Sequence, residues 1–342
     1  MFGCPMTDYD KKIYETEINE FVPKHMVDSH THVYEFGLKK GVKQAPSPST
    51  SWTGKVAKEN PIEDIVQTYK DAFPNQKVVP VIFGSPSADK AATNGYISKV
   101  AKEYNYPALY CTHVNMTADF LEEEVIKGGF QGLKPYCGNV KDDVFPPEAG
   151  IFDFLPHEHL KVANKYGWKV VLHISKSDRL KNADNIRDLM EIEQKYPNVK
   201  LIVAHIGRAY APEDIGDAFE TLKHTKNMMF DFCANTLPEA TEKCIEAVGT
   251  KRLLWGTDLP IAKMRMYRIH ENGNYVNVVP RGVYGDVSSD IHMRETDDPN
   301  ITTFTYETIR GFMKTVKKMG LTKQDVEDVM CNNAVKLYDI KF

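Results

Sequence analysis

Apolar residues recur along the chain in short runs that predict buried strands. Valine, isoleucine, leucine and aromatic residues fill most positions of each run, and strands that are apolar on both faces are typical of parallel sheets. The runs lie at 26–33, 77–83, 108–116, 129–136, 169–175, 200–207, 227–233 and 253–260. Their regular recurrence predicts eight parallel strands.

The segments between these runs have the apolar spacing of helices. Examples lie at 61–73, 212–225 and 238–248, and the last two open with proline followed by acidic residues, which favours a helix start. Alternation of strands and helices predicts right-handed βαβ units. Eight units favour closure into an α/β fold of the (β/α)₈ TIM-barrel type, with residues 1–342 as one domain. A doubly wound open sheet is the alternative.

Two longer segments interrupt this rhythm. Residues 34–60 are rich in proline and serine and include Trp52, and residues 261–301 form a long basic and aromatic insertion after the eighth strand. Loops of this length are commonly lids or binding loops. Both should emerge at the C-terminal face of the barrel, where barrel enzymes carry their sites. The pattern at 302–340 predicts two helices at the end of the domain.

Composition and charge narrow the class of protein. The formal net charge of −4 gives no reason to expect nucleic acid or an anionic membrane as partner. The six cysteines form no CxxC pair and are expected to be reduced thiols. No apolar run approaches the roughly 20 residues of a membrane helix, and the N-terminus does not resemble a signal peptide. We therefore expect a cytoplasmic protein that acts on a small molecule; assembly as a homodimer is left open.

The first strand carries the sharpest local motif, Asp28-Ser29-His30-Thr31-His32. Alternate residues on a strand point to the same side, so His30 and His32 should project together. Two imidazoles on one face can bind one cation. Taken alone this motif is weak, because ordinary core or surface histidines are the commoner explanation.

Three further strands change that interpretation. His173, His205 and Asp258 each stand at the C-terminal end of an apolar run, where valine or leucine would be the usual residue. Each buried polar group costs a few kcal/mol unless it is paired. A shared cation would satisfy all of them, so the sequence predicts a metal site.

This arrangement resembles the amidohydrolase superfamily over nearly the whole chain. The ending at 325–340, DVEDVMCNNAVKLYDI, is similar to the closing helix of the amidohydrolase-2 branch, which contains aminocarboxymuconate-semialdehyde decarboxylase and related hydrolases. The resemblance implies one divalent metal ion, expected to be zinc. It also implies catalytic roles for residues at the ends of strands six and eight.

Carried onto this chain, the resemblance makes His30, His32, His173 and Asp258 the metal ligands. It makes His205 the general base or electrophile, with Asp258 also counted as catalytic. The chemistry is sound on general grounds, because such a site leaves an open position for water, whose pKa a metal lowers towards about 7. A nearby histidine can orient or deprotonate that water.

Lys134, in the fourth strand, has two interpretations. In binuclear members of the superfamily a strand-four lysine is carboxylated and bridges two metals, which would make Lys134 the bridge to a second ion. The alternative is an ammonium group that binds substrate at the mouth of the barrel. We favour the ammonium and one metal, because the chain ending resembles the mononuclear branch.

Other polar residues near strand ends are candidates for binding substrate. His113 and Asp231 lie at the depth of the expected pocket, and Asp28 is either a hydrogen-bond partner of a ligand or a strand-edge acid. Arg208 and Arg265 could clamp a substrate carboxylate, since a guanidinium matches it bidentately. A solvated or interface-facing basic loop explains these arginines equally well. The basic cluster after Asp258 consists of Lys263, Arg265 and Arg268.

Three function classes fit these residues. The favoured one is a metal-dependent hydrolase that cleaves an amide, ester or lactone with an activated water, because hydrolysis is the commonest activity of the superfamily. A metal-dependent non-oxidative decarboxylase of a small carboxylic acid would use the same residues. A non-catalytic metal-binding or ligand-binding protein is the third class, and the substrate itself cannot be inferred from fold analogy.

Overall fold

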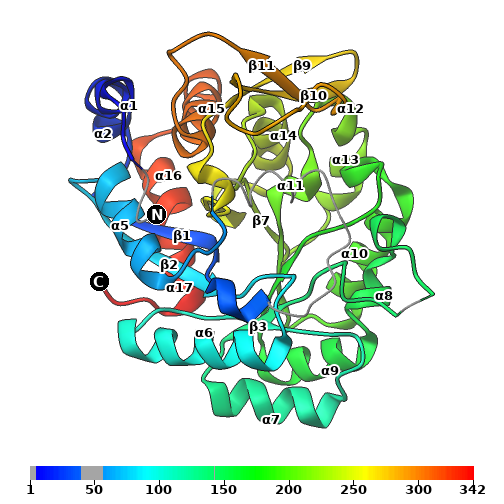
Figure 1. Ribbon diagram of the computed structural model, residues 1–342. Coiled ribbons are helices and arrows are strands. Elements are labelled where there is room, and N and C mark those ends of the chain that lie inside the picture. Colours follow the sequence, from blue (N-terminus) through cyan, green and yellow to red (C-terminus); the bar gives the residue numbers. More distant parts are fainter. Residues whose placement is uncertain (1–4, 40–56, 142) are drawn as a thin grey trace.

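The computed structural model of the protein describes residues 5–39, 57–141 and 143–342 (Figure 1). Residues 40–56 lie outside the described part of the chain. Most of the loop expected at 34–60, including Trp52, is therefore not described here.

The strands of the main fold all run parallel to their neighbours. Their bounds are β1 His25–His32, β2 Lys77–Phe83, β3 Tyr110–Cys111, β4 Gly132–Lys134, β5 Lys169–Leu172, β6 Lys200–Val203, β7 Met229–Asp231 and β8 Leu253–Leu254. β1 pairs with β2, and β3 to β8 form a six-stranded sheet in sequence order. Several strands are shorter than their apolar runs, because the residues after the strand leave the ladder and carry polar side chains instead.

Backbone hydrogen bonds join the β1–β2 pair to both edges of the six-stranded sheet. On one side the Ser29 N–H donates to the Trp255 carbonyl at 3.0 Å, and the Asp258 N–H donates to the His30 carbonyl at 2.9 Å. On the other side the Ile82 N–H donates to the Pro107 carbonyl at 2.9 Å. The predicted α/β fold with parallel strands is thus confirmed.

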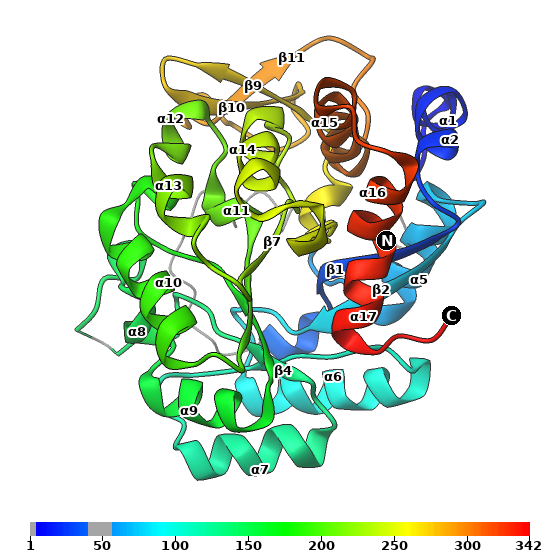
Figure 2. The same cartoon turned by 180° about the vertical axis from the view of Figure 1, so that it is seen from behind.

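Helices surround the strands in both views of the ribbon (Figures 1 and 2). The α-helices are α1 Asp8–Ile13, α2 Asn19–Phe21, α5 Ile62–Ala72, α6 Lys90–Tyr104, α7 Ala118–Gly128, α8 Ile151–Phe154, α9 His157–Tyr166, α10 Ala183–Lys195, α11 His205–Arg208, α12 Pro212–Ile215, α13 Ala218–Leu222, α14 Pro238–Val248, α15 Phe304–Met319, α16 Lys323–Glu327 and α17 Asn333–Tyr338. Short 3₁₀ or π turns are η1 Tyr14–Ile18, η2 Phe36–Lys39, η3 Pro146–Glu148, η4 Arg179–Lys181, η5 Thr250–Arg252, η6 Ile261–Lys263 and η7 Asp328–Asn332. None of the helices in these described ranges is long and apolar enough to cross a membrane.

The prediction of one continuous helix at 212–225 is wrong. The structure divides it into α12 and α13 at Gly216, whose φ of +52° and ψ of −138° interrupt a right-handed helix. The proline start is confirmed, because Pro212 occupies the first turn of α12 and Asp214 caps it by accepting the Ala211 N–H at 2.8 Å.

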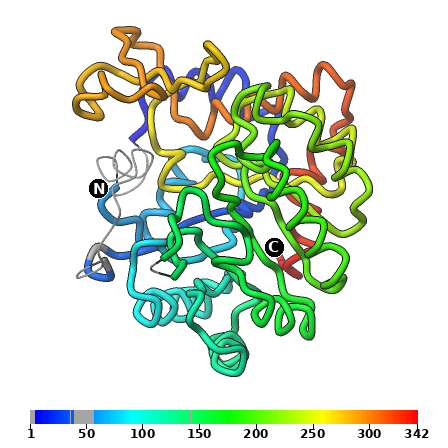
Figure 3. Tube along the Cα trace, turned by 90° about the vertical axis from the view of Figure 1, so that its right-hand side faces the viewer, coloured from blue at the N-terminus to red at the C-terminus, as the bar shows by residue number. Residues whose placement is uncertain are grey.

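Residues 261–301 carry a sheet of their own. β9 Tyr267–Glu271 pairs antiparallel with β10 Asn274–Pro280, and β10 pairs parallel with β11 Met293–Thr296. Asn272 and Gly273 form the two-residue turn, with φ values of +50° and +76°, which suits a tight hairpin. This sheet lies at the side of the molecule opposite α7 (Figures 1 and 3).

Alternate residues of the strands enter two different apolar clusters. On β1, Met26 belongs to the cluster shared with the surrounding helices, whereas Val27 joins Val171, Ile202 and Leu254 from other strands. Residues of η7 and α17 close this second cluster, so the end of the chain lies against the first strand (Figure 2). Burial on both faces explains the near-continuous apolar runs.

Candidate metal centre

His30, His32 and Asp258 form a compact group of potential ligands. One donor atom from each lies within 4.8 Å of the others. Oδ1 of Asp258 is 3.1 Å from His32 Nε2 and 3.6 Å from His30 Nε2. The group forms because β1 ends in the two histidines and the segment after β8 is bonded to β1 through backbone hydrogen bonds.

The hydrogen bonds of His30 fix which nitrogen faces this group. Its Nδ1 lies 3.0 Å from Oδ2 of Asp231, and since a carboxylate only accepts, Nδ1 carries the proton. Nε2 is then unprotonated and directed towards Asp258. A carboxylate that holds a histidine in this way is the usual support of a metal-binding imidazole.

The same reasoning applies to His32. The Tyr136 hydroxyl donates to the Gly84 carbonyl at 2.6 Å, so at 3.1 Å it can only accept from His32 Nδ1. His32 Nε2 is therefore unprotonated as well, and it faces a carboxylate oxygen at 3.1 Å. Two lone pairs at this distance repel each other unless a cation or a proton lies between them.

Protonation of the histidines is disfavoured at neutral pH. Burial lowers the pKa of His30 well below its ordinary value, with the Lys134 ammonium acting in the same direction. Burial also lowers the pKa of His32, although Asp258 opposes the change. A cation is thus the better partner for the group. Ligand atoms about 2.0–2.1 Å from a tetrahedral zinc are roughly 3.3 Å apart, which agrees with the observed 3.1 and 3.6 Å.

His205 lies beside this group on an unusual turn. His205, Ile206, Gly207 and Arg208 all have positive φ, between +50° and +62°, so the chain makes one left-handed turn directly after β6. Such a conformation is costly for residues other than glycine. The Asn235 side-chain amide holds it by donating to the carbonyls of His205 and Ala209 at 3.2 and 2.9 Å.

The turn aims the imidazole of His205 at His30. Nδ1 of His205 lies 2.9 Å from the Cys233 carbonyl oxygen, which can only accept, so Nδ1 is protonated and Nε2 is free to accept a proton or bind a metal. The ring centroids of His30 and His205 are 5.0 Å apart. Backbone strain gathers at this end of the strands, since Ala234 and Asp258 also have positive φ, of +48° and +62°.

His173 lies on the far side of His205. Their ring centroids are 5.2 Å apart in an edge-to-face arrangement. Burial lowers the pKa of His173 well below its ordinary value, and His205 and Arg208 add to the effect. His173 is near the site, but in the described chain it is not in the group whose donor atoms lie within 4.8 Å of one another.

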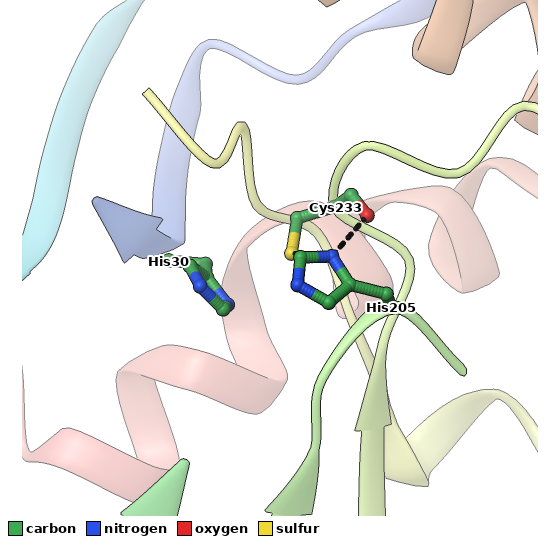
Figure 4. A group of neighbouring side chains, drawn as sticks. All are labelled: His30, His205 and Cys233. Atoms are coloured by element: carbon green, nitrogen blue, oxygen red, sulfur yellow. Dashed lines mark hydrogen bonds between the residues drawn. The ribbon is translucent and has the colours of Figure 1, made fainter. Parts of the chain in front are cut away.

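A second group of potential ligands overlaps the first. His30, His205 and Cys233 also place one donor atom each within 4.8 Å of the others (Figure 4). Cys233 is fully buried, and its thiol donates to Oδ1 of Asp231 at 2.7 Å. A Cβ at Gly256 would lie 2.9 Å from His30 Cβ and 3.2 Å from Cys233 Cβ, so the absence of a side chain there lets β1 and β7 approach.

Lys134 extends from β4 into the same cluster and is 1% exposed. Its Nζ lies 3.4 Å from His30 Nε2 and 4.9 Å from the centre of the Phe83 ring. Burial lowers the pKa of Lys134, while the carboxylates of Asp231 and Asp258 oppose the change. Lys134 thus reaches the atoms that face the predicted metal.

Two of the three other expected substrate residues, Arg208 and His113, lie in the loops around the cluster. Arg208 donates from Nη1 to the carbonyls of Ser175 and Lys176, the latter at 3.2 Å, which ties the turn after β6 to the end of β5. His113 accepts the N–H of Asn115 at 3.2 Å in the turn after β3.

Arg265 is placed differently from the prediction. Its guanidinium is paired with buried Asp10, with Nη1 3.1 Å from Oδ1 and Nη2 2.6 Å from Oδ2. The carboxylate that Arg265 binds is therefore one of the protein itself, on α1, which corrects the expectation that this residue clamps substrate. Lys263 is likewise occupied, donating to Asn60 Oδ1 at 2.8 Å.

Arg268, from the same basic cluster, does point towards the site. It donates to the Ala234 carbonyl at 2.9 Å, one residue after Cys233. Its guanidinium lies 4.7 Å from the ring centres of both Tyr210 and Tyr275. Tyr210 in turn is 6.2 Å from the His205 ring. Arg268 therefore brings positive charge to the edge of the histidine cluster from the β9–β10 hairpin.

The sequence interpretation gave too little weight to Asp231. Its carboxylate accepts from the His30 ring, the Cys233 thiol and, at 2.8 Å, the His205 N–H. One signal for this role was in the sequence, because an acid at the end of a buried apolar strand needs several donors. Cys233, two residues later, gave no such signal.

Asp28 supports the strands by accepting hydrogen bonds from main-chain N–H groups and hydroxyls. It accepts hydrogen bonds from the Thr257 and His30 N–H groups, at 2.9 and 3.1 Å, and from the Tyr69 hydroxyl at 2.7 Å. These bonds hold β1 against the segment that carries Asp258. Burial raises the pKa of Asp28 to about 6, although the Thr257 and Tyr69 hydroxyls oppose the rise.

The family model described as Amidohydrolase matches residues 27–340 of the chain. No curated protein sequence matches it.

Solved structures with the same fold include a probable 2-pyrone-4,6-dicarboxylic acid hydrolase from Acinetobacter baumannii. It is 14% identical, with a TM-score of 0.57, and the match covers 92% of this chain and 99% of that one. A 2,6-dihydroxybenzoate decarboxylase from Rhizobium is 11% identical, with a TM-score of 0.55 and coverage of 93% and 99%. A 5-carboxyvanillate decarboxylase from Sphingomonas paucimobilis is 10% identical, with a TM-score of 0.53 and coverage of 93% and 100%. At these identities the likeness establishes the fold alone.

Proposed function

Because the chain belongs to the amidohydrolase family, whose members are metal-dependent enzymes, we propose that it is a metal-dependent hydrolase of an amide, ester or lactone. The observation that carries this proposal is the orientation of His205. Its protonated Nδ1 is held by the Cys233 carbonyl, so the unprotonated Nε2 stands beside His30 as a base. Hydrolysis requires such an acceptor for the proton of the attacking water.

The proposed fold is a (β/α)₈ barrel. The hydrogen bonds from β1 to the segment after β8, and from β2 to the segment before β3, support closure. The split of alternate strand residues into an inner and an outer apolar cluster agrees with it. In this fold residues 261–301 are an insertion after the eighth strand, and its β9–β10 hairpin carries Arg268 to the mouth of the barrel.

We assign the metal to His30, His32 and Asp258, with His173 as a fourth ligand that the family resemblance implies. The donor set of imidazole nitrogens and one carboxylate suits zinc. When bound, the ion would polarise the substrate carbonyl and lower the pKa of a water molecule towards about 7. Lys134 is assigned as an ammonium rather than a bridging carbamate, because its Nζ can donate to His30 Nε2 at 3.4 Å, it faces the Phe83 ring, and the carboxylates of Asp231 and Asp258 favour its charged form.

Asp231, His205 and Lys134 have separate proposed roles in the reaction. Asp231 holds His30 in the tautomer that presents Nε2. His205 accepts the proton of the attacking water at Nε2 and returns it to the leaving group. The Lys134 ammonium stabilises negative charge that develops on the substrate oxygen, since it reaches the cluster from β4.

The proposed substrate bears a carboxylate. Arg208 and Arg268 supply the positive charge at the edge of the cluster, on the turn after β6 and on β9. Only Nη1 of Arg208 is used in hydrogen bonds within the described residues, so its other nitrogens can meet a carboxylate. His113 at the end of β3 is a further candidate for contact with substrate.

Replacing His205 by asparagine is expected to lower kcat by about 10²–10⁴-fold, because the proton acceptor is lost. Metal content should stay close to that of the wild type, since His205 is outside the His30, His32 and Asp258 group. Elemental analysis and steady-state kinetics on the same preparation would check both. Loss of the metal in this variant would show that His205 is a ligand and overturn its assignment as base.

Replacing Arg208 by methionine should raise KM for a carboxylate-bearing substrate by roughly 10- to 150-fold, the equivalent of 1.5–3 kcal/mol for a charged hydrogen bond. Arg208→Lys is the matched control, because it keeps the charge and loses the planar fork. An unchanged KM in both variants would restrict Arg208 to holding the loop after β5.

Decarboxylation is the alternative, because two of the solved structures with this fold are decarboxylases and the same residues would serve. The two reactions differ in their products. Candidate carboxylated lactones, esters and amides would be turned over in water labelled with heavy oxygen. Heavy oxygen in the organic acid product, without release of carbon dioxide, supports hydrolysis. Release of carbon dioxide, with no label in the remaining organic product, would replace the proposal by decarboxylation.

A further inference from the structure

Cys233 has no part in the proposed hydrolysis, yet it lies within the cluster. The thiol is fully buried at the end of β7, with its sulfur 3.2 Å from His205 Nδ1. Buried cysteines away from a site usually act as small apolar residues. This one is surrounded by imidazoles and a carboxylate instead, which is an environment that binds metals.

Three strands bring suitable donor atoms together around this sulfur. His30 lies in β1, and His205 and Cys233 lie two residues after the ends of β6 and β7. One ligand atom of each lies within 4.8 Å of the others. The two histidines present unprotonated nitrogens, because their Nδ1 protons are donated to Asp231 and to the Cys233 carbonyl. Figure 4 shows the sulfur and the second ring nitrogen of His205 on the side that faces His30.

This donor set differs in chemistry from the neighbouring one. It has two nitrogens and a sulfur, whereas the His30, His32 and Asp258 group has two nitrogens and an oxygen. Thiolate ligands select soft cations, and carboxylate ligands select harder ones such as Mn²⁺. Both groups include His30, whose only available lone pair is on Nε2. One histidine nitrogen cannot serve two ions, so the groups exclude each other.

We propose that His30, His205 and Cys233 form a second metal subsite, which takes a thiophilic cation in exchange for the ion of the His30, His32 and Asp258 group. On binding, the S–H bond breaks, a bond between sulfur and the cation forms, and the proton passes to the buffer. The hydrogen bond from the thiol to Asp231 is given up. Because the exchange also engages His205, it removes the proposed base, whichever reaction the enzyme performs.

The test uses the full-length protein, stripped of metal with a chelator and titrated with Cd²⁺ and separately with Mn²⁺. In the wild type Cd²⁺ should produce the ultraviolet charge-transfer absorption of a cadmium–thiolate bond, and prior Cd²⁺ should block Mn²⁺ binding. Cys233→Ser should lose the absorption and bind Cd²⁺ more than about 100-fold more weakly, beyond the 10- to 100-fold cost of an outer-shell change. Its Mn²⁺ affinity should change far less.

Two further variants keep the outcome decisive. Cys111→Ser changes another buried thiol, on β3, and should keep the absorption. Asp258→Asn should lose Mn²⁺ binding but keep the cadmium–thiolate absorption, because Asp258 is outside the sulfur group. Absorption that persists in Cys233→Ser, or a wild type that binds Cd²⁺ without it, would overturn the subsite. Failure of Asp258→Asn to lose Mn²⁺ would instead count against the proposed metal site.

Discussion

Asp258→Asn is expected to abolish stoichiometric Mn²⁺ binding by the His30, His32 and Asp258 group and, with it, activity. The substitution keeps the shape of the side chain and removes the only carboxylate of the His30, His32 and Asp258 group. In the wild type, Asp258 Oδ1 lies 3.1 Å from the unprotonated His32 Nε2, and a cation would relieve this repulsion. The asparagine amide could donate a hydrogen bond to His32 Nε2 directly, which removes that need for a cation. We expect the affinity to fall by more than about 100-fold, the upper limit for changes outside the ligand shell.

The measurement is Mn²⁺ per chain after equilibrium dialysis, together with turnover. The wild type should hold about one divalent ion per chain, as the assignment of Lys134 as an ammonium requires. Asp231→Asn is the matched control: it removes the support of His30 without removing a ligand of this group and should weaken binding by about 10- to 100-fold. Wild-type Mn²⁺ content in Asp258→Asn would refute the assignment, and two Mn²⁺ ions per chain in the wild type would point to a carboxylated lysine.

Arg265→Met is expected to destabilise the fold by about 3 kcal/mol while leaving kcat and KM of the folded enzyme unchanged. Asp10 is completely buried, and Arg265 is the cation that binds both of its oxygens. Removing one partner of a buried ion pair typically costs 3–5 kcal/mol. The hydrogen bonds that Asp10 accepts from Thr302 and Thr7, at 2.6 and 2.7 Å, place the expected loss at the lower end.

Urea unfolding at neutral pH would measure this loss. Arg281→Met is the control, because Arg281 pairs with Asp297 at an exposed position and such pairs contribute little. A large change in KM with unchanged stability would restore the interpretation of Arg265 as a substrate clamp.

The loss should also depend on pH in a defined direction. Burial alone would raise the pKa of Asp10, but the hydrogen bonds from Arg265, Thr302 and Thr7 outweigh it and hold the pKa below its ordinary value of 3.8. A lowered pKa in the folded state stabilises the protein above pH 3.8, and this contribution is lost as the pH falls through the lower, folded-state value. The unfolded chains titrate alike, so the difference between wild type and Arg265→Met should be largest at neutral pH. It should shrink as the pH falls through the higher folded-state pKa that Asp10 has without Arg265, and level off below the folded-state pKa of the wild type.

The sequence by itself determined the class of fold and the residues at the strand ends. Apolar runs flanked by helical segments predicted parallel strands, because strands buried on both faces require continuous apolar residues whatever their neighbours are. His30, His32 and Asp258 stood out for the same reason, as polar residues where such strands end. The two-residue spacing of the histidines is a local property, and it is retained in their shared contact with Asp258.

The partners of these residues were decided only by the tertiary structure. Arg265 pairs with Asp10, 255 positions away in the sequence, and Asp231 holds His30 from 201 positions away. No local pattern specifies such pairs, because they depend on which strands and loops the packing brings together. The left-handed turn at His205 is likewise imposed by contacts such as those of Asn235, against the preference of its residues. Local patterns set where polar groups occur, and packing sets what each of them faces.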